Sequence, residues 1–335
     1  MSLKLQNTDI NALDLYTGDI NKAYLGSTLV YGSEVAASGI YDNASVVYSL
    51  RRPDMATKWT NAVLRLRRSS DNATADVFLL NHSSPSVGDT VTLSSQISTT
   101  SPTTPDATLL SAWVGSNDAY VVRIYGITPD NTIDDNKRLN ETTTSLQPKF
   151  ISNGVILTKN GKADIDFSAS TSIRLRGDAN ASLDSGNDFT IFTVSYSNSS
   201  TNFNAVLSTK LASGGTNSRL AVHNDRKTDR RLAIIRNTTA TDFEVLYDVQ
   251  QDNANQRLQT LVMASGTMEG FLNGVSQDSI AVTGTYVNDD LVMGIERGAN
   301  GLDGGVQEAI IFPSDKTADL TALHADINAY YTIYV

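Results

Sequence analysis

The chain has 335 residues and carries 26 Lys and Arg against 36 Asp and Glu, which gives a net charge of −10. This acidic balance excludes the positive surface that nucleic acids and anionic membranes attract, so we expect neither as a partner. The chain has no cysteine, which excludes disulfides and thiolate zinc sites. No apolar run approaches the ~20 residues that span a bilayer, so we expect no membrane insertion.

Small polar residues dominate the composition. Ser, Thr and Asn together supply 98 of the residues, and they suit turns and exposed strand faces better than helix interiors. Apolar stretches nevertheless recur at short spacing along the chain. This pattern predicts an all-β protein with many short strands and polar loops.

Residues 1–33 are predicted to form a separate attachment, followed by a linker at residues 34–39. The stretch 25–32 (LGSTLVYG) is typical of a strand closed by glycine. The attachment is too short to bury its own apolar face, because an isolated hairpin is marginally stable in water. We expect it to dock on the main body or on another protein. The apolar side chains predicted to make this contact are Leu15, Tyr16, Tyr24, Leu25, Leu29, Val30 and Tyr31.

Residues 41–150 are predicted to be rich in β-strands. Residues 63–68 alternate apolar and basic side chains, which indicates a half-buried strand, and residues 120–125 (YVVRIY) form another candidate strand. Prolines among Ser and Thr predict loops over residues 81–106. This segment is either a domain of its own or part of the same sandwich as the residues that follow.

Residues 151–335 carry the densest strand signals and are predicted to form a β-sandwich. Residues 189–196 (FTIFTVSY) are apolar at nearly every position, as in a strand buried on both faces. Asn273-Gly274 is a strong hairpin signal, since both residues tolerate a positive φ. One helix is predicted from about Thr317 to Tyr331, after a cap at Ser314 or Asp315. Its apolar positions at helical spacing are Leu320, Leu323, Ile327 and Tyr330.

Three groups of segments together carry a family resemblance: residues 48–51 with 64–72, residues 147–149 with 159–162, and residues 304–315 with the C-terminal helix. They resemble the catalytic sandwich of the fungal arabinofuranosidase B family and its relatives in bacteriophage genomes. The resemblance implies a concanavalin A-like (laminin-G-like) jelly roll over residues 41–335. Residues 1–33 resemble a short leader found on phage virion proteins.

The chain also departs from this family at the positions that carry catalysis. Residues 124–129 (IYGITP) lack the Asp-Gln pair that family members usually carry there. The family's acidic residue shortly after the Leu-Gly-Ile-Gly-Gly run falls on Gly298, and its nucleophilic Glu falls near Arg219 and Leu220, where the chain has no carboxylate. We therefore expect a non-catalytic relative of a glycoside hydrolase fold, with no catalytic residue.

Other carboxylates are candidates for a catalytic pair, because retaining glycosidases need two carboxyl groups about 5–5.5 Å apart. Asp164 and Asp166 occupy alternate positions of one strand and so share a face. Charged side chains are usually exposed, so a solvated pair is the preferred interpretation. Glu296 beside Arg297 is similarly interpreted as a surface ion pair.

Two ligands are predicted from local residue patterns, a glycan and a calcium ion. Trp59 stands among polar neighbours and is the candidate for stacking on a glycan, whereas Trp113 is assigned to the core. Calcium is a candidate cofactor, with plain turns as the alternative, because oxygen ligands gather in two loops. Its candidate ligands are Asn300, Asp303, Asp184 and Asp188.

Together these features predict a structural protein on the exterior of a bacteriophage virion. We expect it to be tail-associated, as a fibre, tip or minor tail protein, to form a homo-oligomer, and to contact other virion proteins and host surface glycans. One alternative is a capsid decoration or head-fibre protein. The other is an active glycoside hydrolase of arabinofuranosidase type.

Overall fold

The computed structural model describes residues 39–168, 170–199, 204–211, 217–226, 230–248, 255–298 and 300–334, together with the backbone of four short strands within residues 4–31. The chain divides into two compact units, residues 1–38 and residues 39–335. Each unit is described separately below.

The first unit contains two short antiparallel strand pairs. These are β1 (Lys4–Leu5) with β2 (Thr8–Asp9), and β3 (Ala23–Leu25) with β4 (Thr28–Tyr31). Of the predicted contact residues, Leu15 and Tyr16 lie outside the described residues. The other five lie on β3 and β4, where the backbone alone is described.

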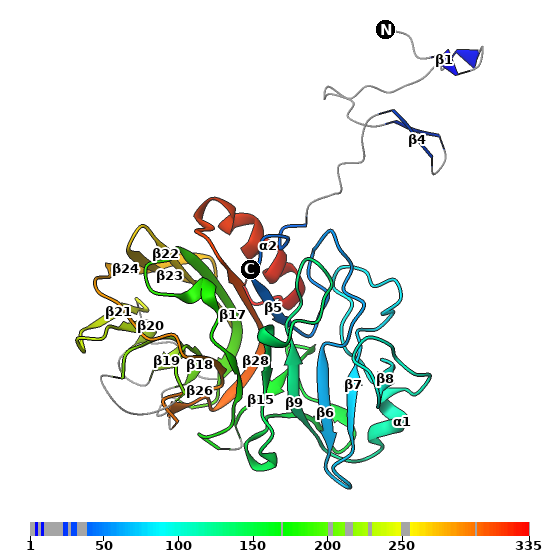
Figure 1. The fold of residues 1–335 in the computed structure, drawn as a ribbon, viewed down its shortest axis with the longest axis horizontal. Coiled ribbons are helices and arrows are strands. Elements are labelled where there is room, and N and C mark those ends of the chain that lie inside the picture. The colour runs from blue at the N-terminus through cyan, green and yellow to red at the C-terminus, as the bar shows by residue number, and fades with distance from the viewer. Residues whose placement is uncertain are drawn as a thin grey trace. The chain divides into compact units, whose positions relative to one another are not determined.

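The second unit is a nearly all-β sandwich, and this confirms the predicted fold class (Figure 1). Every strand pair in its described residues is antiparallel, and the first sheet runs in the order β5-β28-β17-β22-β23-β24. Its strands are β5 (Val46–Ser49), β28 (Gly304–Phe312), β17 (Phe189–Ser197), β22 (Arg257–Ala264), β23 (Thr267–Leu272) and β24 (Val275–Ala281).

The second sheet runs in the order β21-β20-β19-β18-β25-β16-β10-β9-β6-β7-β8. Its sandwich strands are β21 (Asp242–Leu246), β20 (Arg231–Arg236), β19 (Arg219–Arg226), β18 (Ala205–Ser208), β25 (Asp290–Met293) and β16 (Leu175–Asp178). It continues through β10 (Arg138–Asn140), β9 (Ala119–Tyr125), β6 (Leu64–Arg68), β7 (Thr74–Val77) and β8 (Ile97–Ser98).

Short strands complete the unit and join the two predicted segments. Strand β11 (Lys149–Ser152) crosses the boundary expected at residue 150 and pairs with β9 and with β15 (Ile165–Asp166), which in turn pairs with β28. Residues 41–150 and 151–335 are therefore joined by strand pairing within one unit. The remaining strands are β12 (Val155–Ile156), β13 (Thr158–Lys159), β14 (Lys162–Ala163), β26 (Ile295–Glu296) and β27 (Asn300–Gly301).

Local sequence signals explain several of these elements. Strand β17 is buried along nearly its whole length, because it lies between β22 and β28 with apolar residues on both faces. Asn273 and Gly274 both have positive φ and form the tight turn between β23 and β24, as predicted. Strand β6 alternates buried and half-buried residues, in agreement with its apolar–basic pattern.

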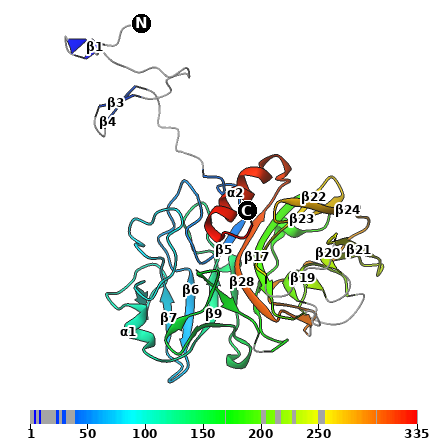
Figure 2. The ribbon, with the colours of Figure 1, turned by 180° about the vertical axis from the view of Figure 1, so that it is seen from behind.

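The predicted C-terminal helix is α2 (Leu320–Tyr331), which lies against the sandwich when the molecule is seen from either side (Figures 1 and 2). Its apolar side chains Leu320, Leu323 and Ile327 are buried, and the Asp315 side chain accepts a hydrogen bond from the amide of Thr317 just before it. A second, short helix, α1 (Leu110–Val114), was not predicted; it places Trp113 in the core. No helix in the described part of the chain is long and apolar enough to cross a membrane.

A buried ion pair joins α2 and β28 to the residues that follow β5. The guanidinium of Arg51 lies 3.1 Å from one carboxylate oxygen of Glu308 on β28 and 2.9 Å from Asp326 on α2. The Ser49 hydroxyl donates a 2.7 Å hydrogen bond to Glu308, and the Tyr41 hydroxyl donates one of the same length to Asp326. Arg51 and Glu308 are each only 1% exposed, so each charge depends on the other for compensation.

Replacing Glu308 with Gln should therefore lower the free energy of unfolding by about 3–5 kcal/mol, because it leaves the buried Arg51 undercompensated. Urea denaturation measures this change. The control is Asp319→Asn, which removes an ion pair between Lys316 and a carboxylate that is 56% exposed, and should cost less than about 1 kcal/mol. Equal losses in the two variants would contradict the role of the buried pair.

Candidate functional site

A groove lined almost entirely by polar side chains crosses three adjacent strands of the second sheet. Its volume is about 260 Å³, and we call it the polar groove. It is lined by Asp135, Arg138, Asn140, Arg176, Gly177, Asp178 and Asp290, from β10, β16, β25 and the turn before β10. An adjoining hollow of about 210 Å³ shares Asp178 and extends the site along residues 179–182.

Strand register explains why these side chains gather. Residues at alternate positions of a strand share a face, so Arg176 and Asp178 both point away from the core. Leu175 points to the opposite face and is buried in the core. The antiparallel pairing sets Asn140 opposite Arg176, and Asp178 opposite Asp290. Gly177 is required here, because a Cβ at this position would lie 2.2 Å from the carbonyl oxygen of Arg138.

The charges in the polar groove are mostly paired with one another. The Arg176 guanidinium donates a 2.7 Å hydrogen bond to Asp290, which also accepts a 3.3 Å bond from the amide of Leu211. Arg138 forms an ion pair with Asp135. Asp178 is exposed, and its side chain makes no hydrogen bond or ion pair within the part of the chain that the structure describes. Its carboxylate is therefore free to accept hydrogen bonds from a ligand.

A second polar cluster lies buried on the same sheet, over β19. The guanidinium of Arg219 contacts both carboxylate oxygens of Glu296 on β26, at 2.7 and 3.2 Å. Nε2 of His223 lies 3.4 Å from Glu296, and neither ring nitrogen has a hydrogen-bond partner within the described residues. The amide of Asn300 donates a further 2.9 Å bond to Glu296.

Burial controls the protonation of this cluster. It lowers the pKa of His223, so the ring stays neutral at neutral pH. Burial alone would raise the pKa of Glu296, but its interactions with His223 and with the Arg219 guanidinium outweigh burial and hold that pKa well below its usual range. Since Glu296 is 1% exposed and His223 is fully buried, the cluster presents no accessible acid or base.

The cluster corrects one sequence interpretation and refines another. Glu296 does not form a surface ion pair with Arg297; its partner is Arg219, 77 residues earlier in the chain. The family resemblance placed catalytic carboxyl groups near residues 219–220 and at residue 298. The contact between Arg219 and Glu296 brings these two segments together. The Leu220 side chain is buried in the hydrophobic core.

Asp164 and Asp166 also differ from the predicted solvated pair. Asp164 is 1% exposed, and burial raises its pKa to about 7. The Tyr196 hydroxyl donates a 2.8 Å bond to one carboxylate oxygen, while the other oxygen has no partner within the described residues. Gly305 makes room for this arrangement, because a Cβ there would lie 2.3 Å from that second oxygen. Asp166 is half-buried.

Trp59 is not the exposed sugar platform that its polar neighbours suggested. It is 2% exposed, and its ring nitrogen donates a 3.3 Å hydrogen bond to the carbonyl of Ala62. The indole therefore belongs to the core, and stacking on a glycan would require it to leave that position.

The loops predicted to hold calcium use polar atoms for internal hydrogen bonds. Asp184 accepts a 2.8 Å bond from the amide of Asn288, and Asp188 accepts one of the same length from the backbone of Ser265. The Asn300 amide binds Glu296, and the backbone of Asp303 accepts a bond from Asn198. Within the described residues, no group of three or more His, Asp or Glu side chains is arranged to hold a metal ion.

The buried Asp164 predicts a specific pH dependence. An unfolded Asp titrates near 3.9 and the folded residue near 7, so the native protein loses stability as the pH rises between these values. Asp164→Asn removes this loss. The free energy of unfolding of the variant, relative to that of the wild type, should therefore increase by up to about 4 kcal/mol between pH 4 and pH 8.

Urea denaturation at the two pH values measures this difference. The control is Asp248→Asn, since Asp248 is exposed. The interpretation fails if the difference between Asp164→Asn and the wild type is the same at both pH values.

Comparison with known proteins identifies the architecture. No protein-family model matches the chain, and no curated protein matches it. Solved structures that match it include a GH54 α-L-arabinofuranosidase soaked with a cyclic sulfate inhibitor, with a TM-score of 0.56 and 12% identity. Another is an arabinofuranosidase complexed with arabinofuranosyl-α-1,2-xylobiose, with a TM-score of 0.53 and 12% identity. In both cases the match covers 87% of this chain and 63% of the other.

These matches correct the prediction of a non-catalytic relative. The matching structures are glycoside hydrolases, so the departures at residues 124–129, 219–220 and 298 do not place the chain outside a catalytic fold. At 12% identity the likeness shows the β-sandwich fold of a glycoside hydrolase and does not establish activity. The chain spans about 63% of the length of these structures.

Proposed function

We propose that this protein binds a carbohydrate in the polar groove. The observation that carries the proposal is the exposed, unpaired carboxylate of Asp178, which lies beside the Arg176–Asp290 pair in a groove lined by planar polar side chains. Each sugar hydroxyl is both a donor and an acceptor. Carboxylate oxygens accept from such hydroxyls, and guanidinium groups donate to them.

The charge balance of the groove favours a neutral sugar. Arg176 is paired with Asp290 and Arg138 with Asp135, so Asp178 supplies the one unpaired charge among the lining residues. An anionic sugar would be repelled by this carboxylate and by the net charge of −10 on the chain. The arabinofuranosidase fold supports a sugar ligand, since one of the matching proteins was solved with an oligosaccharide bound.

Truncating the free carboxylate tests this proposal. Asp178→Ala should weaken glycan binding about ten-fold or more, because a hydrogen bond to a charged group contributes about 1.5–3 kcal/mol. A glycan array identifies the ligand, and calorimetry then compares the variant with the wild type. Asp248→Asn, at an exposed acid that follows β21, is the control and should bind normally. Unchanged binding in Asp178→Ala would contradict the proposal.

A second candidate function is glycoside hydrolysis, and a specific observation favours it. Asp178 and Asp290 lie directly opposite each other on β16 and β25, where Cβ atoms of paired residues are about 4.5–5.5 Å apart. Carboxyl groups carried on such a pair can approach the separation of about 5–5.5 Å at which one serves as nucleophile and the other as acid/base. Arg176 and the amide of Leu211 orient Asp290 for the nucleophilic role, and the exposed Asp178 suits proton transfer.

If this pair is catalytic, turnover of aryl α-L-arabinofuranosides should fall about 10²–10⁴-fold in Asp178→Asn and in Asp290→Asn. Release of the aryl group measures turnover, with Asp248→Asn again as the control. Turnover that survives both substitutions but disappears in Glu296→Gln would assign catalysis to the buried cluster instead.

We also propose that the protein is a tail-associated structural component of a phage virion, with a capsid decoration protein as the alternative. The support is the resemblance of residues 1–33 to virion leaders and the separation of residues 1–38 as a unit of their own. Short strands with unsatisfied edges can pair with a partner protein. Host glycans would then be ligands of the larger unit, and calcium stays a candidate ligand of its loops.

Removing residues 1–38 should leave a folded second unit that no longer enters particles. Incorporation is measured by blotting purified virions, and circular dichroism checks that the truncated protein keeps its β-sheet signal. Labelled antibody then distinguishes a tail position from a capsid position. Normal incorporation of the truncated protein would exclude residues 1–38 as the attachment.

A further inference from the structure

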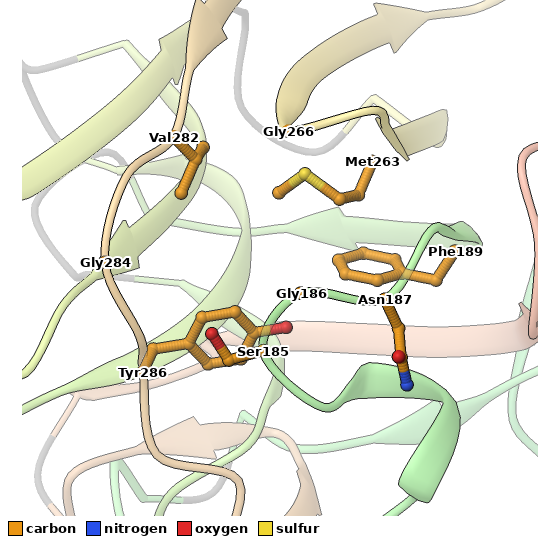
Figure 3. Close-up of a pocket in the computed structure, with 9 residues that line it drawn as sticks. All are labelled: Ser185, Gly186, Asn187, Phe189, Met263, Gly266, Val282, Gly284 and Tyr286. Atoms are coloured by element: carbon orange, nitrogen blue, oxygen red, sulfur yellow. The ribbon is translucent and has the colours of Figure 1, made fainter.

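A small, mainly apolar pocket lies among the turns that contain Gly186, Gly266 and Gly284, and it shares no lining residue with the polar groove (Figure 3). Its volume is about 70 Å³. That is well above the ~10–15 Å³ that one water molecule requires, and below the ~150 Å³ of a cavity that holds benzene. We call it the end pocket, and it is lined by Ser185, Gly186, Asn187, Phe189, Met263, Gly266, Val282, Gly284 and Tyr286.

Four apolar side chains, from two strands and one connection, form its walls. Met263 lies on β22 and Phe189 on β17, while Val282 and Tyr286 lie in the connection from β24 to β25. In Figure 3 the side chains of Met263 and Val282 point toward each other across the pocket, and the Tyr286 ring lies on its other side. The Tyr286 hydroxyl already donates a 2.6 Å bond to the carbonyl of Leu183, so this residue offers the pocket its ring alone.

The turns around the pocket are fixed by the fold, so the cavity is preformed. Gly186, Gly266 and Gly284 all have positive φ, which forms tight turns without side chains at the rim. The Asp188 carboxylate accepts a 2.8 Å bond from the backbone of Ser265, which ties two of these turns together.

One polar group in the pocket is free to bind a ligand. The hydroxyl of Ser185, which lines the pocket, makes no hydrogen bond within the described residues (Figure 3). Asn187 points away from the pocket centre in the same view. The pocket thus combines an apolar enclosure with a single donor at its edge, which suits a group that carries a methyl and a carbonyl.

Two chain segments connect the end pocket with the polar groove. Residues 180–182 line the hollow beside the groove, and residues 185–187 line the end pocket. Three residues of chain span at most about 10 Å. The segment 282–291 likewise contributes Tyr286 to the pocket and Asp290 to the groove. The two sites are therefore built from neighbouring stretches of the same two chain segments.

We propose that the end pocket binds the acyl group of an acylated sugar, with acetyl as the group that fits. The methyl packs against Phe189, Met263 and Val282, and the carbonyl oxygen accepts a hydrogen bond from Ser185. The inference that the acyl group belongs to a carbohydrate rests on the proposed function of the polar groove, and it narrows the ligand to glycans with O-acetyl or N-acetyl substituents.

The test uses the full chain labelled with ¹³C at its methionine methyl groups. The chain has five methionines, and the spectrum of Met263→Leu assigns the signal of Met263. N-acetylglucosamine is the probe, and glucose, which lacks the acetamido group, is its control. Val282→Trp fills the pocket from a half-buried position, and Val275→Trp places the same side chain at a valine that is 63% exposed on β24.

N-acetylglucosamine should shift the Met263 signal in a saturable way, and glucose should not. Val282→Trp should abolish the shift, Val275→Trp should preserve it, and Ser185→Ala should weaken binding about five-fold by removing one neutral hydrogen bond. A missing shift, an equal shift with glucose, or a shift that survives Val282→Trp would overturn the inference. Asp248→Asn, at an exposed acid that lines neither site, should leave this response intact. A normal Met263 shift in a protein that binds no array glycan would defeat the groove proposal alone.

Discussion

The buried ion pair between Arg51 and Glu308 is the contact on which the rest of the sandwich depends. Glu308 lies on β28, the strand that pairs with β17, β5 and β15 and so joins the N-terminal strands to the sandwich. Arg51 adds a contact to Asp326 on α2, so one guanidinium connects a loop, a central strand and the terminal helix. An unpaired buried charge would greatly lower the free energy of unfolding, so the ion pair holds these three elements together.

The outward face of the second sheet carries two Arg–carboxylate pairs with opposite exposure. Arg219 on β19 and Glu296 on β26 are both buried, and their opposite charges compensate each other. Arg176 is 54% exposed while its partner Asp290 is 9% exposed, so this pair borders solvent. The first pair therefore stabilises the face, and the second is available to a ligand.

A short segment connects these two pairs. The amide of Leu211 donates to Asp290, and the carbonyl of Lys210 accepts from the amide of Arg297, next to Glu296. The position of Asp290 in the polar groove is therefore tied to the buried cluster. The cluster can serve the groove as a support without touching a ligand.

Features set by neighbouring residues could be predicted from the sequence. The apolar run of β17, the Asn273-Gly274 turn and the spacing of Leu320, Leu323 and Ile327 each reflect a local rule, and each element formed as expected. The sandwich was predicted from the family resemblance of separate segments. The structure brings two of these segments together, since Ser49 of one lies opposite Glu308 of the other.

The candidate site could not be predicted in the same way, because its contacts join residues far apart in the chain. Arg176 and Asp290 are separated by 114 positions, and no local pattern marks them as partners. Glu296 was assigned to the surface from its neighbour Arg297, and Trp59 from its polar neighbours, yet both are buried by distant strands and loops. Only strand register, which the sequence does not show, sets Asp178 opposite Asp290.

The most direct test of a carbohydrate site in the polar groove is a crystal structure of the protein soaked with the glycan selected on the array. Sugar hydroxyls within hydrogen-bond distance of Asp178 and Arg176 are the expected result. Electron density for the sugar elsewhere on the sandwich, with the groove occupied by water alone, would contradict the account.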